Sequence, residues 1–442
     1  MHGAIDRRSL IKGTAMLAAA GAWKQGAAMK PSEQASHDRW HALEVPRPDG
    51  LLDGEPALQA PAPDSMGVAF AVKGLANGFV EVGEDPALRE GETRRFMAEG
   101  LPLAQIDSRV LRVRLEGLEP GKKYWYRAGA ATIASSGGYW TKPSEIVWGA
   151  VHSFTTPGES APSHFALMSD THEDFKQMAK IVAKYKELGV PLVVWNGDIP
   201  RSMVKEREDL VRCHLLPPGC EGFAADVPIA FNRGNHDFRG SAAAQLNTVS
   251  MPRRPQERDS RFAALDRNFA FRMGEIAIIG LDTGEDKPDF HPAAGGQSRF
   301  TQYRTLQSKW LRETLERRDI ASAPFAVAIV HIPIVEFRPG ANPGTILEDY
   351  AEWQKECAEL WGPTLTAHGV QLVLAGHLHR YMHVPPAAGA SWATIVAGGR
   401  GVSTFQTLIE CKTEDGRLLV RVHNTDKGTI AGEHWFDKRM VG

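Results

Sequence analysis

The sequence predicts an α/β fold preceded by a small all-β region. From about residue 51 to 156, short segments alternate apolar and polar residues and are separated by turns, which is typical of β-strands. From residue 163 onward, short apolar runs alternate with segments of helical periodicity, the order of a sheet covered by helices. With 442 residues, the chain is long enough for two or three domains.

Composition and charge narrow the class of protein. Hydrophobic residues make up 43% and charged residues 24%, as in ordinary globular proteins. A net charge of −2 predicts no nucleic-acid-binding surface. No apolar run approaches the ~18 residues of a transmembrane segment. Four cysteines are too few for a disulfide scaffold, although Cys213 and Cys220 are either a loop disulfide or two separate thiols.

The first residues are typical of a targeting segment. Arg7 and Arg8 precede a short, alanine-rich apolar stretch over residues 14–23, and small residues follow as far as Ala28. Residues 1–28 resemble a twin-arginine signal peptide, the alternative being a basic amphipathic helix. The resemblance implies the twin-arginine export machinery as a partner and a periplasmic or secreted protein.

The all-β region contains a recognisable corner. Residues 67–72, 78–83 and 110–115 are predicted strands. A leucine, a Pro-Gly turn and then Tyr124 and Tyr126 follow, the pattern of a tyrosine corner in a β-sandwich. Residues 45–157 thereby resemble the fibronectin-III-like domain that precedes the catalytic domain of purple acid phosphatases. The resemblance implies a structural role.

In the α/β region, polar side chains follow the ends of five apolar runs. The runs cover residues 165–168, 191–195, 227–231, 325–330 and 369–374. Because ligands bind at the carboxyl ends of strands in α/β folds, we expect these side chains to meet in one site. Further strands are expected at 391–397, 407–412 and 418–423, the last two joined by a turn at Asp415-Gly416.

The side chains after these runs form a set of metal ligands. Carboxylate, imidazole and amide groups together suit divalent Mn, Fe, Zn or Co, and the absence of thiolates argues against a structural zinc site. Seven ligands exceed one tetrahedral site but fit two adjacent metals when one carboxylate bridges them. The candidates are Asp170, His172, Asp198, Asn235, His331, His377 and His379.

The order D-x-H, G-D, G-N-H-D, H and G-H-x-H resembles the calcineurin-like metallophosphoesterases. The resemblance implies a four-layer α/β/β/α metallophosphoesterase sandwich over residues 163–435. It assigns the candidates to two divalent metal ions. Asp170, His172 and His379 would hold the first. Asn235, His331 and His377 would hold the second, and Asp198 would bridge them.

The same resemblance implies a catalytic role for His236, which would contact the scissile phosphate and protonate the leaving oxygen. Asp237 would orient His236, or else serve as a turn residue that caps the next segment. The implied function is an exported phosphoesterase that hydrolyses small phosphomonoesters by in-line attack of a metal-bridging hydroxide. The alternatives are a phosphodiesterase with the same metal core and a non-catalytic phosphate-binding surface protein.

Some residues depart from the purple acid phosphatases. Those enzymes have a tyrosine ligand soon after the G-D aspartate, but no tyrosine follows Asp198 at this spacing. They lack His172 as a ligand, and their third motif usually ends in Glu rather than Asp237. We therefore expect no tyrosinate–iron chromophore.

Two loops are candidates for contact with the substrate. Residues 282–298 are a candidate loop over the site. A second, arginine-rich loop either binds phosphate or is a solvated basic surface, and its arginines are Arg239, Arg253, Arg254, Arg258 and Arg261.

Overall fold

The computed structural model describes residues 30–45, 50–98, 106–136, 140–201, 203–252, 260–292, 296–334, 348–386, 390–399 and 405–439. The expected signal peptide, residues 1–28, lies outside them. The chain divides into two compact units. The smaller comprises residues 1–46 and 133–144. In it, α1 (Pro31–His41) contacts β8 (Trp140–Pro143), because Trp40 Nε1 donates a hydrogen bond of 2.9 Å to Thr141 O.

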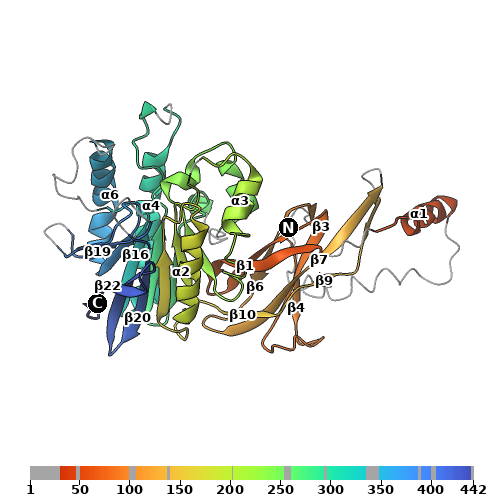
Figure 1. The fold of residues 1–442 in the computed structure, drawn as a ribbon, viewed down its shortest axis with the longest axis horizontal. Helices are drawn as coiled ribbons and strands as arrows, with labels where there is room; N and C mark the ends of the chain where they lie inside the picture. Colours follow the sequence, from red (N-terminus) through yellow and green to blue (C-terminus); the bar gives the residue numbers. More distant parts are fainter. Residues whose placement is uncertain are drawn as a thin grey trace, which may run out of the picture. The chain divides into compact units, whose positions relative to one another are not determined.

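The larger unit contains a nine-stranded sheet (Figure 1). The central strands β11, β12 and β13 are parallel, and β1 continues the parallel order beside β13. The outer strands pair antiparallel. The order is β22 (Thr429–Phe436), β21 (Arg417–Asn424), β20 (Thr407–Glu414), β11 (His164–Met168), β12 (Val193–Asn196), β13 (Ile229–Asn232), β1 (Leu52–Ala62), β2 (Ser65–Val72), β6 (Val110–Glu116).

A second, six-stranded sheet follows the order β14 (Phe269–Met273), β15 (Ile276–Leu281), β16 (Phe325–Val330), β17 (Leu372–Ala375), β19 (Ala393–Val396), β18 (Met382–Val384). Its four central strands are parallel. The main helices of this unit are α2 (Phe175–Glu187), α3 (Arg207–His214), α4 (Phe300–Leu315), α5 (Arg318–Ala321) and α6 (Glu348–Ala367).

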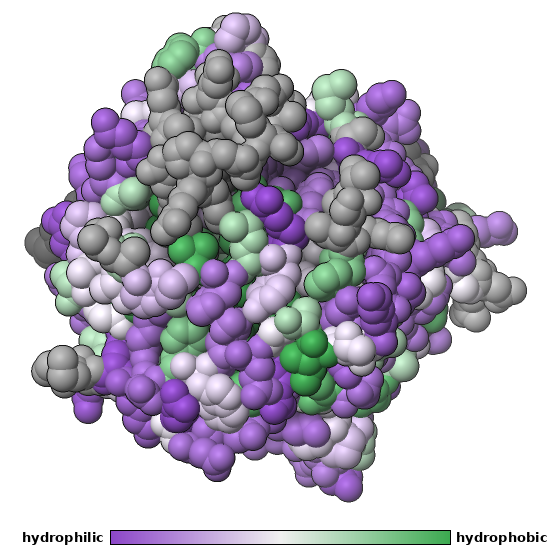
Figure 2. Space-filling view, turned by 60° about the vertical axis from the view of Figure 1, so that its left-hand side comes forward, coloured by the Kyte–Doolittle hydropathy of each residue, from purple (hydrophilic) through white to green (hydrophobic). Residues whose placement is uncertain are grey.

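Three apolar cores confirm the predicted four layers. Because side chains alternate along a strand, Val193 and Trp195 of β12 face α2 and α3, whereas Val194 faces the other sheet. The core between the sheets joins β11, β12 and β20 to β15, β16 and β17. The third core packs α4 and α6 on the outer face of the six-stranded sheet. Trp195 is a core residue with 2% exposure. The face of the molecule shown in Figure 2 is mostly hydrophilic, and the apolar residues on it are scattered.

The all-β region packs two sheets around its own core. Strands β10 (His152–Thr155), β7 (Lys123–Ser136), β3 (Ala76–Gly83) and β4 (Arg94–Met97) form one sheet, with β5 (Ile106–Asp107) and β9 (Val147–Trp148) at its margins. The facing sheet consists of β1, β2 and β6. The tyrosine corner is confirmed, since Glu119 N donates to Tyr124 Oη at 2.9 Å.

The nine-stranded sheet runs through both predicted regions, and the sequence pattern did not predict this shared sheet. Gln59 of β1 lies in parallel register with Ile229 of β13. Leu58 N donates to Ala224 O at 2.9 Å, and Tyr126 Oη donates to Ala225 O at 2.7 Å. The sandwich thus supplies three strands to the sheet that carries the phosphoesterase motifs.

Two smaller expectations can be compared with the structure. The hairpin turn is confirmed, because Asp415 and Gly416 have φ of 51° and 73° and join β20 to β21. Cys213 and Cys220 are separate buried thiols rather than a disulfide. Among the described residues, no helix is both long and apolar enough to cross a membrane.

Candidate metal centre

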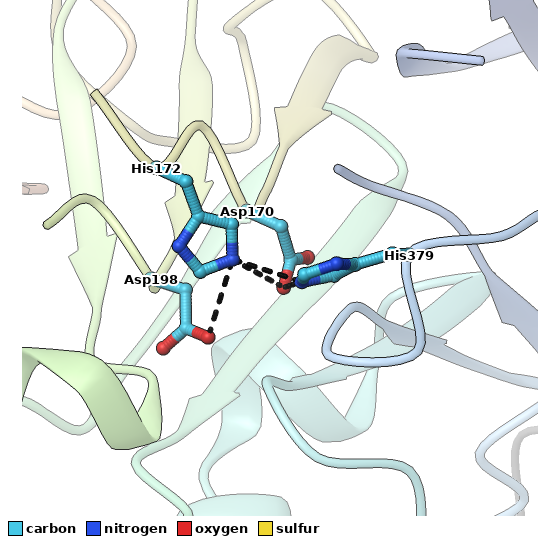
Figure 3. A group of neighbouring side chains, drawn as sticks. All are labelled: Asp170, His172, Asp198 and His379. Carbon is cyan, nitrogen blue, oxygen red and sulfur yellow. Dashed lines mark hydrogen bonds and ion pairs between the residues drawn. The ribbon is translucent and has the colours of Figure 1, made fainter. Parts of the chain in front are cut away.

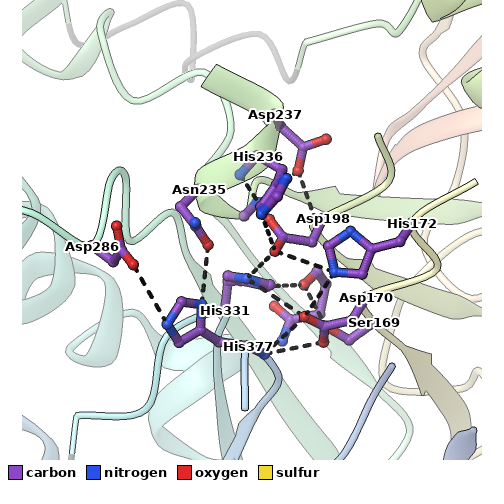
Figure 4. A network of polar contacts seen from close by, with 12 residues as sticks. Ser169, Asp170, His172, Asp198, Asn235, His236, Asp237, Asp286, His331 and His377 are labelled. Carbon is purple, nitrogen blue, oxygen red and sulfur yellow. Dashed lines mark hydrogen bonds and ion pairs between the residues drawn. The ribbon is translucent and has the colours of Figure 1, made fainter. Parts of the chain in front are cut away.

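The structure brings all seven candidate ligands to one edge of the two sheets. Each follows the carboxyl end of a parallel strand: Asp170 and His172 follow β11, Asp198 follows β12, Asn235 follows β13, His331 follows β16, and His377 and His379 follow β17. The candidate ligands labelled in Figure 4 point toward a common centre. The expected juxtaposition is therefore present in the fold.

The backbone at these positions is strained. Asp170, His172, Asp198, His377 and His379 all have φ between 43° and 69°. These are five of the nine non-glycine residues with positive φ in the described part of the chain. Such conformations cost of order 1–3 kcal/mol each and concentrate at functional sites, because only an over-determined surrounding maintains them. Here the left-handed backbone conformations direct the side chains toward the common centre.

Glycines give the ligands room. A Cβ on Gly234 would lie 2.3 Å from Asp198 Oδ1 and 2.7 Å from His331 Cε1. A Cβ on Gly376 or Gly398 would lie 2.5 Å or 2.3 Å from Asp170 Oδ2. The glycines of the G-N-H-D and G-H-x-H motifs are therefore required for a steric reason, since a side chain there would displace a carboxylate.

The first ligand cluster consists of Asp170, His172, Asp198 and His379 (Figure 3). His379 Nε2 lies 3.3 Å from Asp170 Oδ1, and His172 Nε2 lies 3.7 Å from Asp198 Oδ2. The Nε2 atoms of His172 and His379 are 2.8 Å apart. Residues Asp170 and Asp198 are each 1% exposed.

The second cluster consists of Asp198, His331 and His377. His331 Nε2 lies 3.4 Å from Asp198 Oδ2, and the amide oxygen of Asn235 lies 3.1 Å from His377 Nδ1. Asp198 belongs to both clusters. This is the arrangement that a carboxylate bridging two cations requires.

Lone pairs in the centre fit cations. His331 Nδ1 lies 2.6 Å from the carbonyl oxygen of Asn196, which can only accept, so Nδ1 carries the hydrogen of the neutral ring. Its fully buried Nε2 faces the carboxylates of Asp170 and Asp198, and it presents a lone pair to them whenever the ring gives up its second proton. His172 likewise directs Nδ1 to Pro200 O at 3.2 Å. A metal ion would replace the proton between His331 and the carboxylates, and the backbone acceptors fix the ring orientation.

The pKa values reflect the same crowding of charge. Burial would raise the pKa of Asp198, but the His331 imidazole beside it holds that pKa well below its usual range. Burial would lower the pKa of His331, yet the charges of Asp198 and Asp170 outweigh burial and raise it to about 10. Burial and the charge of His331 lower the pKa of His377 to about 4, which favours its neutral, ligating form.

His236 lies beside the clusters. Its backbone N donates to Asp198 Oδ1 at 2.8 Å, and its Nε2 lies 3.9 Å from Asp198 Oδ2. The ring packs edge-on against His172, and its side chain is 27% exposed. Burial lowers its pKa, more than the charge of Asp198 raises it. The neutral ring therefore predominates at neutral pH and has one N–H to donate.

Asp237 contacts backbone rather than the His236 ring. Its Oδ2 accepts hydrogen bonds of 2.8 Å from the backbone N of Asp198 and of Gly234. In the described part of the chain no hydrogen bond joins its carboxylate to the ring of His236. The expectation that Asp237 orients His236 directly is thus not met. The carboxylate instead ties the loop after β12 to the loop after β13, as the alternative of a turn-stabilising residue predicts in part.

Asp286 is a neighbour of the site that the sequence analysis missed. Its Oδ2 lies 3.8 Å from His377 Nε2. It belongs to the candidate loop of residues 282–298, in which no sequence motif marks this aspartate. Arg239, one of the arginines considered for phosphate binding, forms an ion pair in which its Nη2 donates to Glu285 Oε1 at 2.6 Å. Arg261 pairs with Glu313, while Arg253, Arg254 and Arg258 lie outside the described residues.

Comparisons with known proteins agree with the fold. Residues 163–381 match the family model of the calcineurin-like phosphoesterases. Together with the clusters of possible metal ligands, this match indicates a metal-dependent phosphoesterase. A purple acid phosphatase from seeds of yellow lupin (Lupinus luteus) has a similar fold, with a TM-score of 0.61 at 14% identity, over 87% of this chain and 74% of that chain. A dimetal phosphatase from Danio rerio matches 63% of this chain and 99% of that chain, with a TM-score of 0.43 at 14% identity.

Proposed function

We propose that this chain is an exported phosphoesterase with a dinuclear metal centre that hydrolyses small phosphomonoesters. The observation that carries the proposal is the pair of ligand clusters that share Asp198, with His236 at their border. The family of residues 163–381 supports phosphoester chemistry. The export part rests on the twin-arginine pattern at Arg7 and Arg8.

The chain's own residues have distinct tasks in this proposal. Asp170, His172 and His379 would hold one divalent ion, Asn235, His331 and His377 would hold the other, and Asp198 would contribute to both sites. When bound, two such ions neutralise phosphate charge and make a water molecule acidic enough to act as a nucleophile near neutral pH. The strained loops hold the ligands before substrate arrives, so that little reorganisation is needed during the reaction.

His236 would be the protein group that contacts the substrate. It is partly exposed, and its main chain is anchored to the shared carboxylate, so its position relative to both clusters is defined. Its neutral ring donates an N–H to a phosphate oxygen and stabilises the charge that develops there. The role of Asp237 is to hold this segment against the loop after β12.

Parallel assays of mono- and bis-nitrophenyl phosphate with the manganese-loaded protein test the proposal. We expect release mainly from the monoester, and a loss of about 10²-fold in kcat for His236→Ala, the usual effect of removing one donor to a developing charge. His368→Ala, just after α6, is the matched control and should leave the rate unchanged. Release mainly from the diester would establish a phosphodiesterase. Release from neither ester by a protein that binds two metals would contradict the proposal.

A further inference from the structure

We propose that Asp286 is a positioning residue that sets the orientation and the tautomer of His377. It would accept the Nε2–H of that ring and so direct the Nδ1 lone pair toward Asn235 and the second metal. This inference rests on the proposed function, because it assigns Asn235 and His377 to one ion.

The two ring nitrogens of His377 face different groups. Nδ1 lies 3.1 Å from the amide oxygen of Asn235, and Nε2 lies 3.8 Å from Asp286 Oδ2. Figure 4 shows the ring between these two side chains. The main chain of His377 is held as well, since its N donates to both carboxylate oxygens of Asp170 at 3.0 Å. The ring is therefore placed by its backbone on one side and by Asp286 on the other.

The charge of Asp286 selects one tautomer. A neutral imidazole carries a single N–H, and a carboxylate next to Nε2 favours the form that has the hydrogen there. Without a cation, the contact with the Asn235 oxygen favours the hydrogen on Nδ1, whereas a cation held by that oxygen requires the Nδ1 lone pair and hence the Nε2–H form that Asp286 stabilises. A carboxylate behind a ligating histidine is a recurrent arrangement in metal sites, where it also raises the basicity of the ligand. The present separation is an ion-pair distance, and a shift of about half an ångström makes it a hydrogen bond.

Asp286 is itself held in place by cations. Lys287 Nζ donates to Asp286 Oδ1 at 2.5 Å, and Arg239 donates to the same oxygen at 3.4 Å. Arg239 also forms a two-bond pair with Glu285. Both of these contacts are to Oδ1, whereas Oδ2 is the oxygen that lies near His377. Because Arg239 closely follows the third motif, they also join the loop after β15 to the loop after β13.

The test is a titration of the metal-free full-length protein with Mn²⁺, followed by calorimetry and by electron paramagnetic resonance. The wild-type protein should bind two ions and show the spectrum of a spin-coupled pair. Asp286→Ala should weaken one of the two sites by about 10–100-fold, the usual effect of removing such a partner. At limiting Mn²⁺ it should show a mononuclear spectrum, like that of His377→Ala.

Two further variants separate positioning from loop structure. Asp286→Asn keeps an oxygen that can accept the Nε2–H, so it should recover part of the lost affinity. Glu285→Gln removes the neighbouring charge that pairs with Arg239 but leaves Asp286, so its second site should bind Mn²⁺ as the wild type does. Equal losses in Glu285→Gln and Asp286→Ala would overturn the inference in favour of a loop effect.

Comparing the wild type with Asp286→Ala distinguishes a failure of the proposed dinuclear centre from a failure of the proposed role of Asp286. If Asp286→Ala binds both ions with unchanged affinity and spectrum, the role of Asp286 is refuted while the dinuclear centre stands. If the wild-type protein itself binds no pair of ions, the proposed function fails first and this inference fails with it.

Discussion

Asp198 is the side chain on which both ligand clusters depend. It is almost fully buried, takes a left-handed backbone conformation and lies within 4 Å of three imidazoles. Its other oxygen accepts the backbone N of His236. One carboxylate therefore positions the ligands, the two proposed ions and the proposed substrate contact.

Replacing Asp198 should affect both metal sites, whereas replacing His379 should affect only one. Asp198→Asn removes the shared negative charge, and we expect Mn²⁺ stoichiometry to fall below one per chain and kcat/KM to fall by about 10³-fold, because the metals supply several kcal/mol of charge stabilisation. His379→Ala should retain close to one ion per chain. Metal analysis of the dialysed variants measures both numbers. Retention of two ions by Asp198→Asn would refute the shared-ligand assignment.

Gly234 should tolerate no side chain. A Cβ there would contact Asp198 Oδ1 at 2.3 Å and His331 Cε1 at 2.7 Å, so Gly234→Ala should destabilise the protein by about 1–3 kcal/mol and weaken metal binding. Thermal unfolding with and without Mn²⁺ measures this effect. Gly74→Ala is the matched control, because nothing lies within 4 Å of its added Cβ and its φ is not positive. Equal melting temperatures for the two variants would contradict the prediction.

At the scale of elements, β10 is joined to the rest of the larger unit by an ionisable contact. His152 Nδ1 lies 3.1 Å from Asp226 Oδ2, and its Nε2 lies 3.0 Å from Glu55 Oε2. Hydrogen bonding to Asp226 raises the pKa of His152, although burial opposes the shift. The contact connects strands β10 and β1 with the loop before β13.

This contact should stabilise the protein more in acid than in alkaline solution. Because the pKa of His152 is higher in the folded state than its ordinary 6.5, its contribution is complete below pH 6.5 and is lost as the pH rises through the folded value. His152→Asn should therefore lower the free energy of unfolding by about 1 kcal/mol at about pH 5.5 and by less at about pH 8.5. Urea unfolding at both pH values measures the difference, with His368→Asn as control. A larger loss at the higher pH would contradict the assignment.

At the scale of the whole molecule, the sandwich and the phosphoesterase region share one sheet. The strand β1 covers the edge of β13, which leads into the third motif, and buried Leu58 and Gln59 contribute to that junction. Gln59 Oε1 also accepts the backbone N of Met251 at 2.8 Å. Separating the two regions would expose a strand edge and an apolar core.

A chain that begins at residue 158 should not fold into an active phosphoesterase. Without β1, β2 and β6, the edge of β13 loses its partner, and we expect an aggregating product or a loss of cooperative unfolding. A chain that begins at residue 30 should unfold as the full-length protein does. Light scattering and thermal unfolding compare the two. A soluble, cooperative fragment that binds two ions would show that the regions are independent.

The sequence by itself predicted the candidate ligands, their order, most strands that carry them and the four-layer fold. Short motifs beside strand ends encode these features locally, and the parallel sheet brings the ends to one edge. Only the tertiary structure decided that β1 pairs with β13, that Asp237 binds backbone and that Asp286 faces His377. Each of these depends on segments distant in the sequence, and local periodicity does not specify which strand edges pair or which side chains meet across loops.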